Sequence, residues 1–168
     1  MKLKGIMNIT SLSIGDFGGT IIGAAFWFLL AFFISPEEYG EIHYFMGIAG
    51  LAFGISLLGT QDSITVYAAK DVKLAPTLFL ISLIAGGIAA IVIAVIFSRV
   101  DSSFLLLGFI VNNLAIGYIL GKKLFTKYPK YFLLQKSLTF GIGLFSFYLF
   151  GVEGIIFAIA LSYSHFLI

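Results

Sequence analysis

The chain has 168 residues, of which 60% are hydrophobic and 11% are charged, and its formal net charge is +2. A soluble domain carries about 25% charged residues, so this chain has too little charge to cover a soluble surface. The absence of cysteine excludes disulfides, thiol nucleophiles and cysteine-based metal sites. The small net charge gives no indication of nucleic-acid binding, and we expect no nucleic-acid partner.

Hydropathy divides the chain into six apolar segments, which predict an all-α integral membrane protein with one transmembrane helical domain over residues 1–168. The segments cover residues 13–34, 42–69, 77–98, 104–121, 131–150 and 154–168. About 20 apolar residues let a helix cross the hydrocarbon core, and the last segment is shorter than that. We therefore expect a bundle of about six transmembrane helices whose last helix is truncated, as in a fragment of a longer protein.

The basic residues predict the orientation of this bundle. Nine of the ten lie in alternate loops or close to them: Lys2, Lys4, Lys70, Lys73, Lys122, Lys123, Lys127, Lys130 and Lys136. Only Arg99 lies on the opposite side. Because cytoplasmic loops are enriched in lysine and arginine, we expect a multi-pass protein of the cell (cytoplasmic) membrane with a cytoplasmic N-terminus.

The second apolar segment is preceded by a helix-start signal. Ser35-Pro36-Glu37-Glu38 has the pattern of a capping box with proline at the first helical position. A single helix from residue 36 to residue 69 would be about 51 Å long at about 1.5 Å per residue, longer than a core of about 30 Å. We expect the excess to form an interfacial turn around Tyr39 and Gly40.

Several small or polar residues interrupt the apolar segments. Gly15, Gly19 and Gly23 form a doubled G-x-x-x-G pattern, which indicates close helix packing or a helix that lines a cavity. Asp62 lies inside the second segment, where a carboxyl group is unfavourable unless it faces the bundle interior or a water-filled cavity. Two roles remain open for Asp62: a hydrogen bond across helices, or binding of Na⁺ or a proton.

The stretch from Lys122 to Lys130 is the most basic part of the chain. It acts either as a topology signal or as a contact for anionic lipid headgroups or a diphosphate. The residues for the second role are Lys122, Lys123, Lys127 and Lys130.

Enzymatic motifs are missing. The chain has no H-E-x-x-H and no G-x-S-x-G, and no Gly-Lys-Ser/Thr follows its glycine pairs. His43 and His165 are far apart in the sequence. We therefore expect no enzymatic activity, no metal site and no cofactor, apart from the unproven Na⁺ or proton coupling.

The order of these features resembles the N-terminal part of the multidrug/oligosaccharidyl-lipid/polysaccharide flippase superfamily, in its polysaccharide-biosynthesis (oligosaccharide flippase) branch. The residues that carry the resemblance are the glycine-rich segment 13–34, Ser35–Gly40, Leu57–Gly59, Tyr67–Lys70, the basic loop 122–130, Gln135, and Gly151–Ile155. The chain differs from that branch at Thr65-Val66, where members often carry a basic residue. It would correspond to one half of a flippase.

The resemblance implies alternating access, with a lipid-linked oligosaccharide or polysaccharide precursor moved across the membrane. The substrate cavity would then be lined by Asp16, Thr20, Gln61, Asp62, Asn112 and Asn113. The partners would be a polyprenyl-linked glycan, membrane lipids, and either a C-terminal half or further copies of the chain. The alternative is a small non-transporting scaffold or accessory protein of a glycan-assembly complex.

Overall fold

A computed structural model describes residues 2–165, and describes their side chains from Thr10 onward. Within this range the chain forms seven helices and no strand. They are α1 (Lys2–Phe33), α2 (Pro36–Leu57), α3 (Thr60–Ala69), α4 (Ala75–Phe97), α5 (Val100–Gly121), α6 (Lys127–Phe150) and α7 (Glu153–Tyr163).

Five of the described helices are long and apolar enough to cross a membrane: α1, α2, α4, α5 and α6. α7 is apolar but shorter. The expected all-helical membrane architecture is therefore confirmed, with boundaries that differ from the expected ones by several residues and with one helix more.

The additional helix arises because the segment expected over residues 42–69 is broken. Leu58 (φ 48°) and Gly59 (φ 74°) both adopt left-handed backbone conformations. Only glycine adopts this conformation without steric cost, and the two residues together end α2 before α3 starts at Thr60. The break, and not a turn at Tyr39 and Gly40, removes the excess length; those two residues lie inside the continuous α2.

The start of α2 matches the sequence pattern. Ser35 Oγ accepts a hydrogen bond from the Glu38 backbone N–H at 3.2 Å, and the Glu38 carboxylate accepts one from the Ser35 N–H at 2.8 Å. These two bonds satisfy backbone donors that a helix otherwise leaves unpaired at its first turn. The capping box is confirmed.

At the same end of the bundle, Arg99 joins α2 to the turn between α4 and α5. Its guanidinium group contacts Asp101 at 2.9 Å and Glu41 at 2.7 Å, and lies 4.2 Å from the centre of the Phe45 ring. Burial opposes the positive charge, but the hydrogen bonds to the two carboxylates outweigh it and raise the pKa of Arg99. Arg99 therefore has two carboxylate partners, Asp101 and Glu41.

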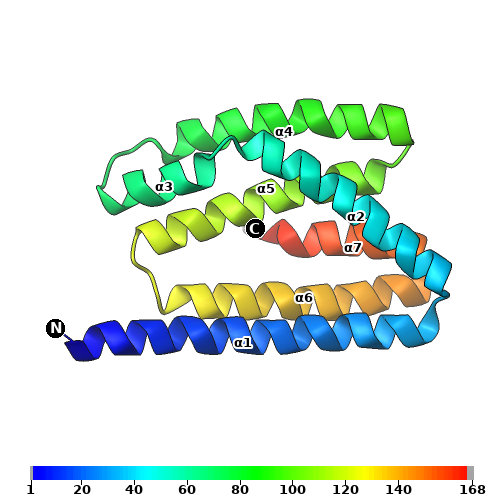
Figure 1. Cartoon of the computed structure of the whole chain (residues 1–168), viewed down its shortest axis with the longest axis horizontal. Helices are drawn as coiled ribbons and strands as arrows, with labels where there is room; N and C mark the ends of the chain where they lie inside the picture. Colours follow the sequence, from blue (N-terminus) through cyan, green and yellow to red (C-terminus); the bar gives the residue numbers. More distant parts are fainter. Residues whose placement is uncertain (1, 166–168) are drawn as a thin grey trace.

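The helices form three layers (Figure 1). α1 and α6 lie side by side at one edge, α3 and α4 lie at the other, and α5 and α7 lie between them, while α2 crosses from the end of α1 toward α4. The N-terminus, the α3–α4 loop and the α5–α6 loop share one end of the bundle, which we call the basic end. The turns α1–α2, α4–α5 and α6–α7 lie at the opposite end, which we call the acidic end.

Glycines of α1 let it approach α6 closely. A Cβ atom placed on Gly15 would lie 2.6 Å from Pro129 Cβ and 2.7 Å from Pro129 Cα, and one placed on Gly19 would collide with the Phe132 ring. By contrast, a Cβ atom placed on Gly47 of α2 would have no atom from other parts of the chain within 4 Å. The doubled G-x-x-x-G pattern therefore serves helix packing at Gly15 and Gly19.

We predict that two glycine-to-alanine substitutions differ in their effect on the free energy of unfolding. Gly15→Ala should lower the free energy of unfolding by about 1–3 kcal/mol because the methyl group meets backbone and ring atoms of Pro129. Gly47→Ala should leave stability unchanged or raise it by up to about 1 kcal/mol, because alanine favours the helix. Thermal unfolding in detergent measures both variants, and equal melting temperatures would contradict the α1–α6 contact.

Candidate functional site

An open cavity of about 270 Å³ lies among α2, α5, α6 and α7; we call it the polar cavity because an otherwise mostly apolar lining includes three amide side chains and a lysine. Its walls combine aromatic rings, amide groups and one cation. They are formed by Gly50, Phe53, Phe109, Asn112, Asn113, Phe132, Gln135, Lys136 and Tyr163. The space exists where α7 ends, because α7 separates α5 from α6, and those two helices make few direct contacts.

Lys136 is the only charged residue in this lining. It is the tenth residue of α6, so it lies about 13 Å along the helix from Lys127 at about 1.5 Å per residue. Its side chain passes over the small residues of α1: a Cβ on Gly19 would lie 3.3 Å from Lys136 Cγ, and a Cβ on Gly23 would lie 3.9 Å from Lys136 Cδ. Gly19 therefore makes room for the lysine as well as for Phe132, whereas a side chain at Gly23 would make only an ordinary contact with the lysine.

The ammonium group of Lys136 contacts aromatic faces. Its Nζ lies 5.4 Å from the centre of the Phe132 ring and 5.8 Å from that of Tyr163. Between residues 10 and 165, no carboxylate lies within ion-pair distance of this group; the ion pairs there involve Arg99 and Lys122. An intramembrane cation is unfavourable without a counter-charge, so the site is chemically suited to an anion.

Buried hydrogen bonds connect α6 to α7 beside Lys136. Gln135 is 1% exposed, and its Nε2 donates to Thr139 Oγ1 at 3.0 Å. Thr139 Oγ1 lies 2.7 Å from Ser162 Oγ on α7. Gln135 Oε1 and His165 Nε2 are buried and have no hydrogen-bond partner among the described atoms. Such atoms are rare in folded proteins, and they mark positions where a bound water or a ligand donor is favourable.

Two amides on α5 form the opposite wall. Asn112 is buried, and its Oδ1 accepts a hydrogen bond from Tyr131 Oη at 2.9 Å, which joins α5 to α6. The Tyr131 ring stacks on His165 with the ring centres 4.5 Å apart. Asn113 donates to the Phe109 carbonyl at 3.3 Å and retains further hydrogen-bonding capacity. The cavity thus offers amide donors and acceptors on the wall that faces the lysine.

The six residues expected to line a substrate cavity do not form one group. Asn112 and Asn113 line this cavity. Asp16 and Thr20 are exposed on α1, where Asp16 accepts a hydrogen bond from Tyr128 Oη at 2.6 Å.

The other two lie on α3. Gln61 is half-buried against Gly117 of α5, and Asp62 is exposed in the first turn of the helix. In the side chains the structure describes, no three His, Asp or Glu residues come close enough to hold a metal ion.

The four basic residues expected to contact anionic groups lie at the basic end. Lys122 is the one with an ion pair, to Asp71 Oδ1 at 2.5 Å. This hydrogen bond lowers the pKa of the exposed Asp71 carboxyl and raises the pKa of Lys122. Lys123, Lys127 and Lys130 are exposed.

Sequence reasoning missed most of the cavity. The sequence pattern marks Lys136 only as one of the basic residues, and it assigns no role to Tyr163 in the lining or to Tyr131, Thr139 and Ser162 beside it. One signal was present: Tyr131, Gln135 and Thr139 repeat every four residues within an apolar segment, which places them on one helix face. The partners on α5 and α7 carry no comparable signal, because they depend on contacts between distant segments.

No family model, curated protein or solved structure matches this chain.

If the cavity contains water, a cysteine placed in its wall should react with a water-soluble thiol reagent. The natural chain has no cysteine, so a single introduced thiol gives no background. Asn113→Cys should be modified by a charged methanethiosulfonate in detergent, whereas Ile156→Cys, at a fully buried position of α7, should not. Mass spectrometry of the intact protein measures the modification, and equal rates at both positions would argue against a hydrated cavity.

Proposed function

We propose that the chain is a flippase-like membrane transporter, or part of one, which moves a lipid-linked oligosaccharide or polysaccharide precursor by alternating access. The observation that carries the proposal is Lys136, a cation within a membrane-spanning helix, directed into a polar cavity and without a carboxylate partner among the described residues. Asp16 and Asp62 lie outside this cavity and carry no part of the proposal.

In this proposal, Lys136 attracts the phosphate groups of the substrate. Charge-assisted hydrogen bonds to phosphate are among the stronger ones in proteins. Asn112, Asn113 and Gln135 supply hydrogen bonds to the glycan, and the unpaired Gln135 Oε1 accepts one from a sugar hydroxyl. The cavity would thus replace the hydration of the polar headgroup while the headgroup is inside the membrane.

The polyprenyl chain needs a path to the lipid. α1 and α2 meet at the acidic end, where the Trp27 ring lies 4.5 Å from His43 and 5.9 Å from Tyr39. From there α2 runs away from α1 (Figure 1), and the two helices make few other contacts. In the proposal, the substrate tail stays in the surrounding lipid while the headgroup is held near Lys136.

Transport can be measured in proteoliposomes with a fluorescent polyprenyl diphosphate-linked oligosaccharide whose outer-leaflet copies are quenched. The purified chain should speed exchange between the leaflets relative to protein-free vesicles. Lys136→Met should slow the exchange by about tenfold or more, since losing one partner of a buried charge pair costs about 2–5 kcal/mol. Lys136→Arg should retain part of the rate.

Lys130→Gln is the matched control, because it removes one charge from an exposed position of the same helix. A rate equal to that of protein-free vesicles would contradict transport by this chain and would favour the scaffold alternative. Equal rates for Lys136→Met and Lys130→Gln would contradict the role of the cavity.

We also propose that the basic end faces the cell interior. Glu37→Cys at the acidic end should react with a membrane-impermeant maleimide in intact cells. Lys123→Cys at the basic end should react only after the cells are permeabilised, because lysine-rich ends remain inside. Labelling of Lys123→Cys in intact cells would show that the basic end faces outward, which would contradict the proposed orientation.

A further inference from the structure

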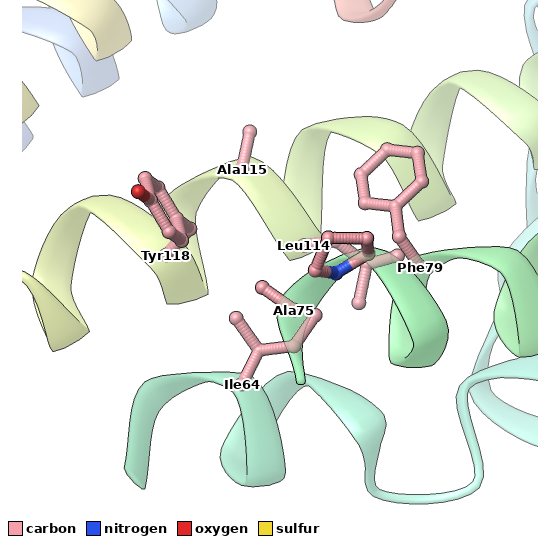
Figure 2. Close-up of a pocket in the computed structure, with 7 residues that line it drawn as sticks. Ile64, Ala75, Phe79, Leu114, Ala115 and Tyr118 are labelled. Atoms are coloured by element: carbon pink, nitrogen blue, oxygen red, sulfur yellow. The ribbon is translucent and has the colours of Figure 1, made fainter. Parts of the chain in front are cut away.

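A second hollow lies among α3, α4 and α5, and it shares no lining residue with the cavity around Lys136. Figure 2 shows its inner part, with side chains from all three helices around one space. It consists of two adjoining pockets that have Ala75, Pro76 and Tyr118 in common.

The inner pocket is apolar and has a volume of about 200 Å³. Its residues are Ile64, Ala75, Pro76, Phe79, Leu114, Ala115 and Tyr118. Ile64, Leu114 and Ala115 are each 1% exposed, so the back wall belongs to the packed core. Apart from the Tyr118 hydroxyl, these side chains offer no hydrogen-bonding group, and such a pocket suits a hydrocarbon chain.

The outer pocket is charged and has a volume of about 490 Å³. Its charged lining residues are Lys73, Lys122 and Asp71, and Lys122 pairs with Asp71 at 2.5 Å. Two ammonium groups and one carboxylate give the pocket a net charge of +1. The Asp71 carboxylate is already paired, so the net positive charge remains for a ligand.

The two pockets follow the direction of the membrane normal. On α3, Ile64 lines the inner pocket and Ala68, one turn nearer the basic end, lines the outer one. On α5, Leu114 lies eight positions before Lys122, or about 12 Å by helical rise. Phe79 on α4 lies one turn deeper than Ala75. Apolar groups of all three helices therefore lie deep, whereas the charged groups, from the α3–α4 loop and the end of α5, lie at the basic end.

We infer that this hollow binds one anionic phospholipid, with an acyl chain in the inner pocket and the phosphate between Lys73 and Lys122. Only a lipid combines a hydrocarbon tail at membrane depth with a charged group at the membrane surface. The net positive charge selects an anionic headgroup over a zwitterionic one. Lysines near a membrane surface contribute about 1 kcal/mol each toward anionic lipid, which corresponds to about a fivefold change in affinity.

Native mass spectrometry of the purified chain tests this inference with phosphatidylglycerol and phosphatidylethanolamine added in equal amounts. We expect one retained phosphatidylglycerol molecule in preference to phosphatidylethanolamine. Lys73→Gln should lower its retention by about fivefold. Lys70→Gln removes the same charge from the same end of the bundle, outside the hollow, and should have a smaller effect.

A second pair of variants tests the acyl-chain pocket. Ala75→Phe should fill the part that both pockets share and abolish retention of either lipid. Ala24→Phe makes the same change at an exposed position of α1 and should retain the lipid. Melting temperatures check that each variant is folded; if Ala75→Phe is not, Ala75→Met replaces it.

Three results would overturn the inference. They are equal retention of the two lipids by the natural chain, equal losses for Lys73→Gln and Lys70→Gln, and undiminished retention by a folded Ala75 variant. Because no arm uses a transport assay, these results are independent of the function proposed for the cavity around Lys136.

Discussion

A polar side chain inside a membrane must find a hydrogen-bond partner within the protein, because the hydrocarbon core supplies none. This constraint determines where most buried polar groups of the chain lie. Thr60 on α3 contacts Ser82 on α4, Ser103 on α5 donates to the Ala90 carbonyl on α4, and Ser146 on α6 donates to the Gly154 carbonyl on α7. Each bond joins two helices. Two groups without such a bond, Gln135 Oε1 and the ammonium of Lys136, lie around the polar cavity, and their position there is the physical basis for expecting a ligand. A third, His165 Nε2, belongs to the ring that stacks on Tyr131.

Small residues decide how closely these helices approach. A Cβ on Gly121 would lie 2.5 Å from the Thr65 carbonyl oxygen and 2.8 Å from Ala68 Cβ, so α5 packs on α3 through bare backbone. Gly143 on α6 plays the same role against the Phe26 ring of α1. Without a hydrophobic driving force between helices in lipid, close packing of this kind supplies much of the association energy. The same closeness positions Lys136, since Gly19 leaves space for its aliphatic stem.

The sequence predicts the features that depend on local chemistry. Length and hydropathy predict the membrane-spanning helices, and Ser35 to Glu38 predict the start of α2 because a capping box involves only neighbouring residues. The break at Leu58 and Gly59 is harder to predict, since Leu58 adopts a backbone conformation that leucine rarely takes. The cavity is harder still to predict, because Asn112, Gln135 and Tyr163 come together only through the packing of α5, α6 and α7. Asp62, the most conspicuous polar residue in the sequence, lies on the exposed side of α3.

α5 is the most buried of the long helices. It lines both the polar cavity and the hollow among α3, α4 and α5. Asn112 and Asn113 face the polar cavity, and the next two residues, Leu114 and Ala115, line the apolar pocket.

On the other side of the cavity, α1 and α6 form a closely packed pair that reaches α5 mainly through α7. Transporters of many folds work by rocking one rigid group of helices against another around a central site. In the proposed transport cycle, the α1–α6 pair would be the group that moves, because its direct contacts with α2 and α5 are few and α7 is its main connection to them. A lipid held between α3, α4 and α5 would then stabilise the stationary group, because it fills a space that these helices leave open beside their common core.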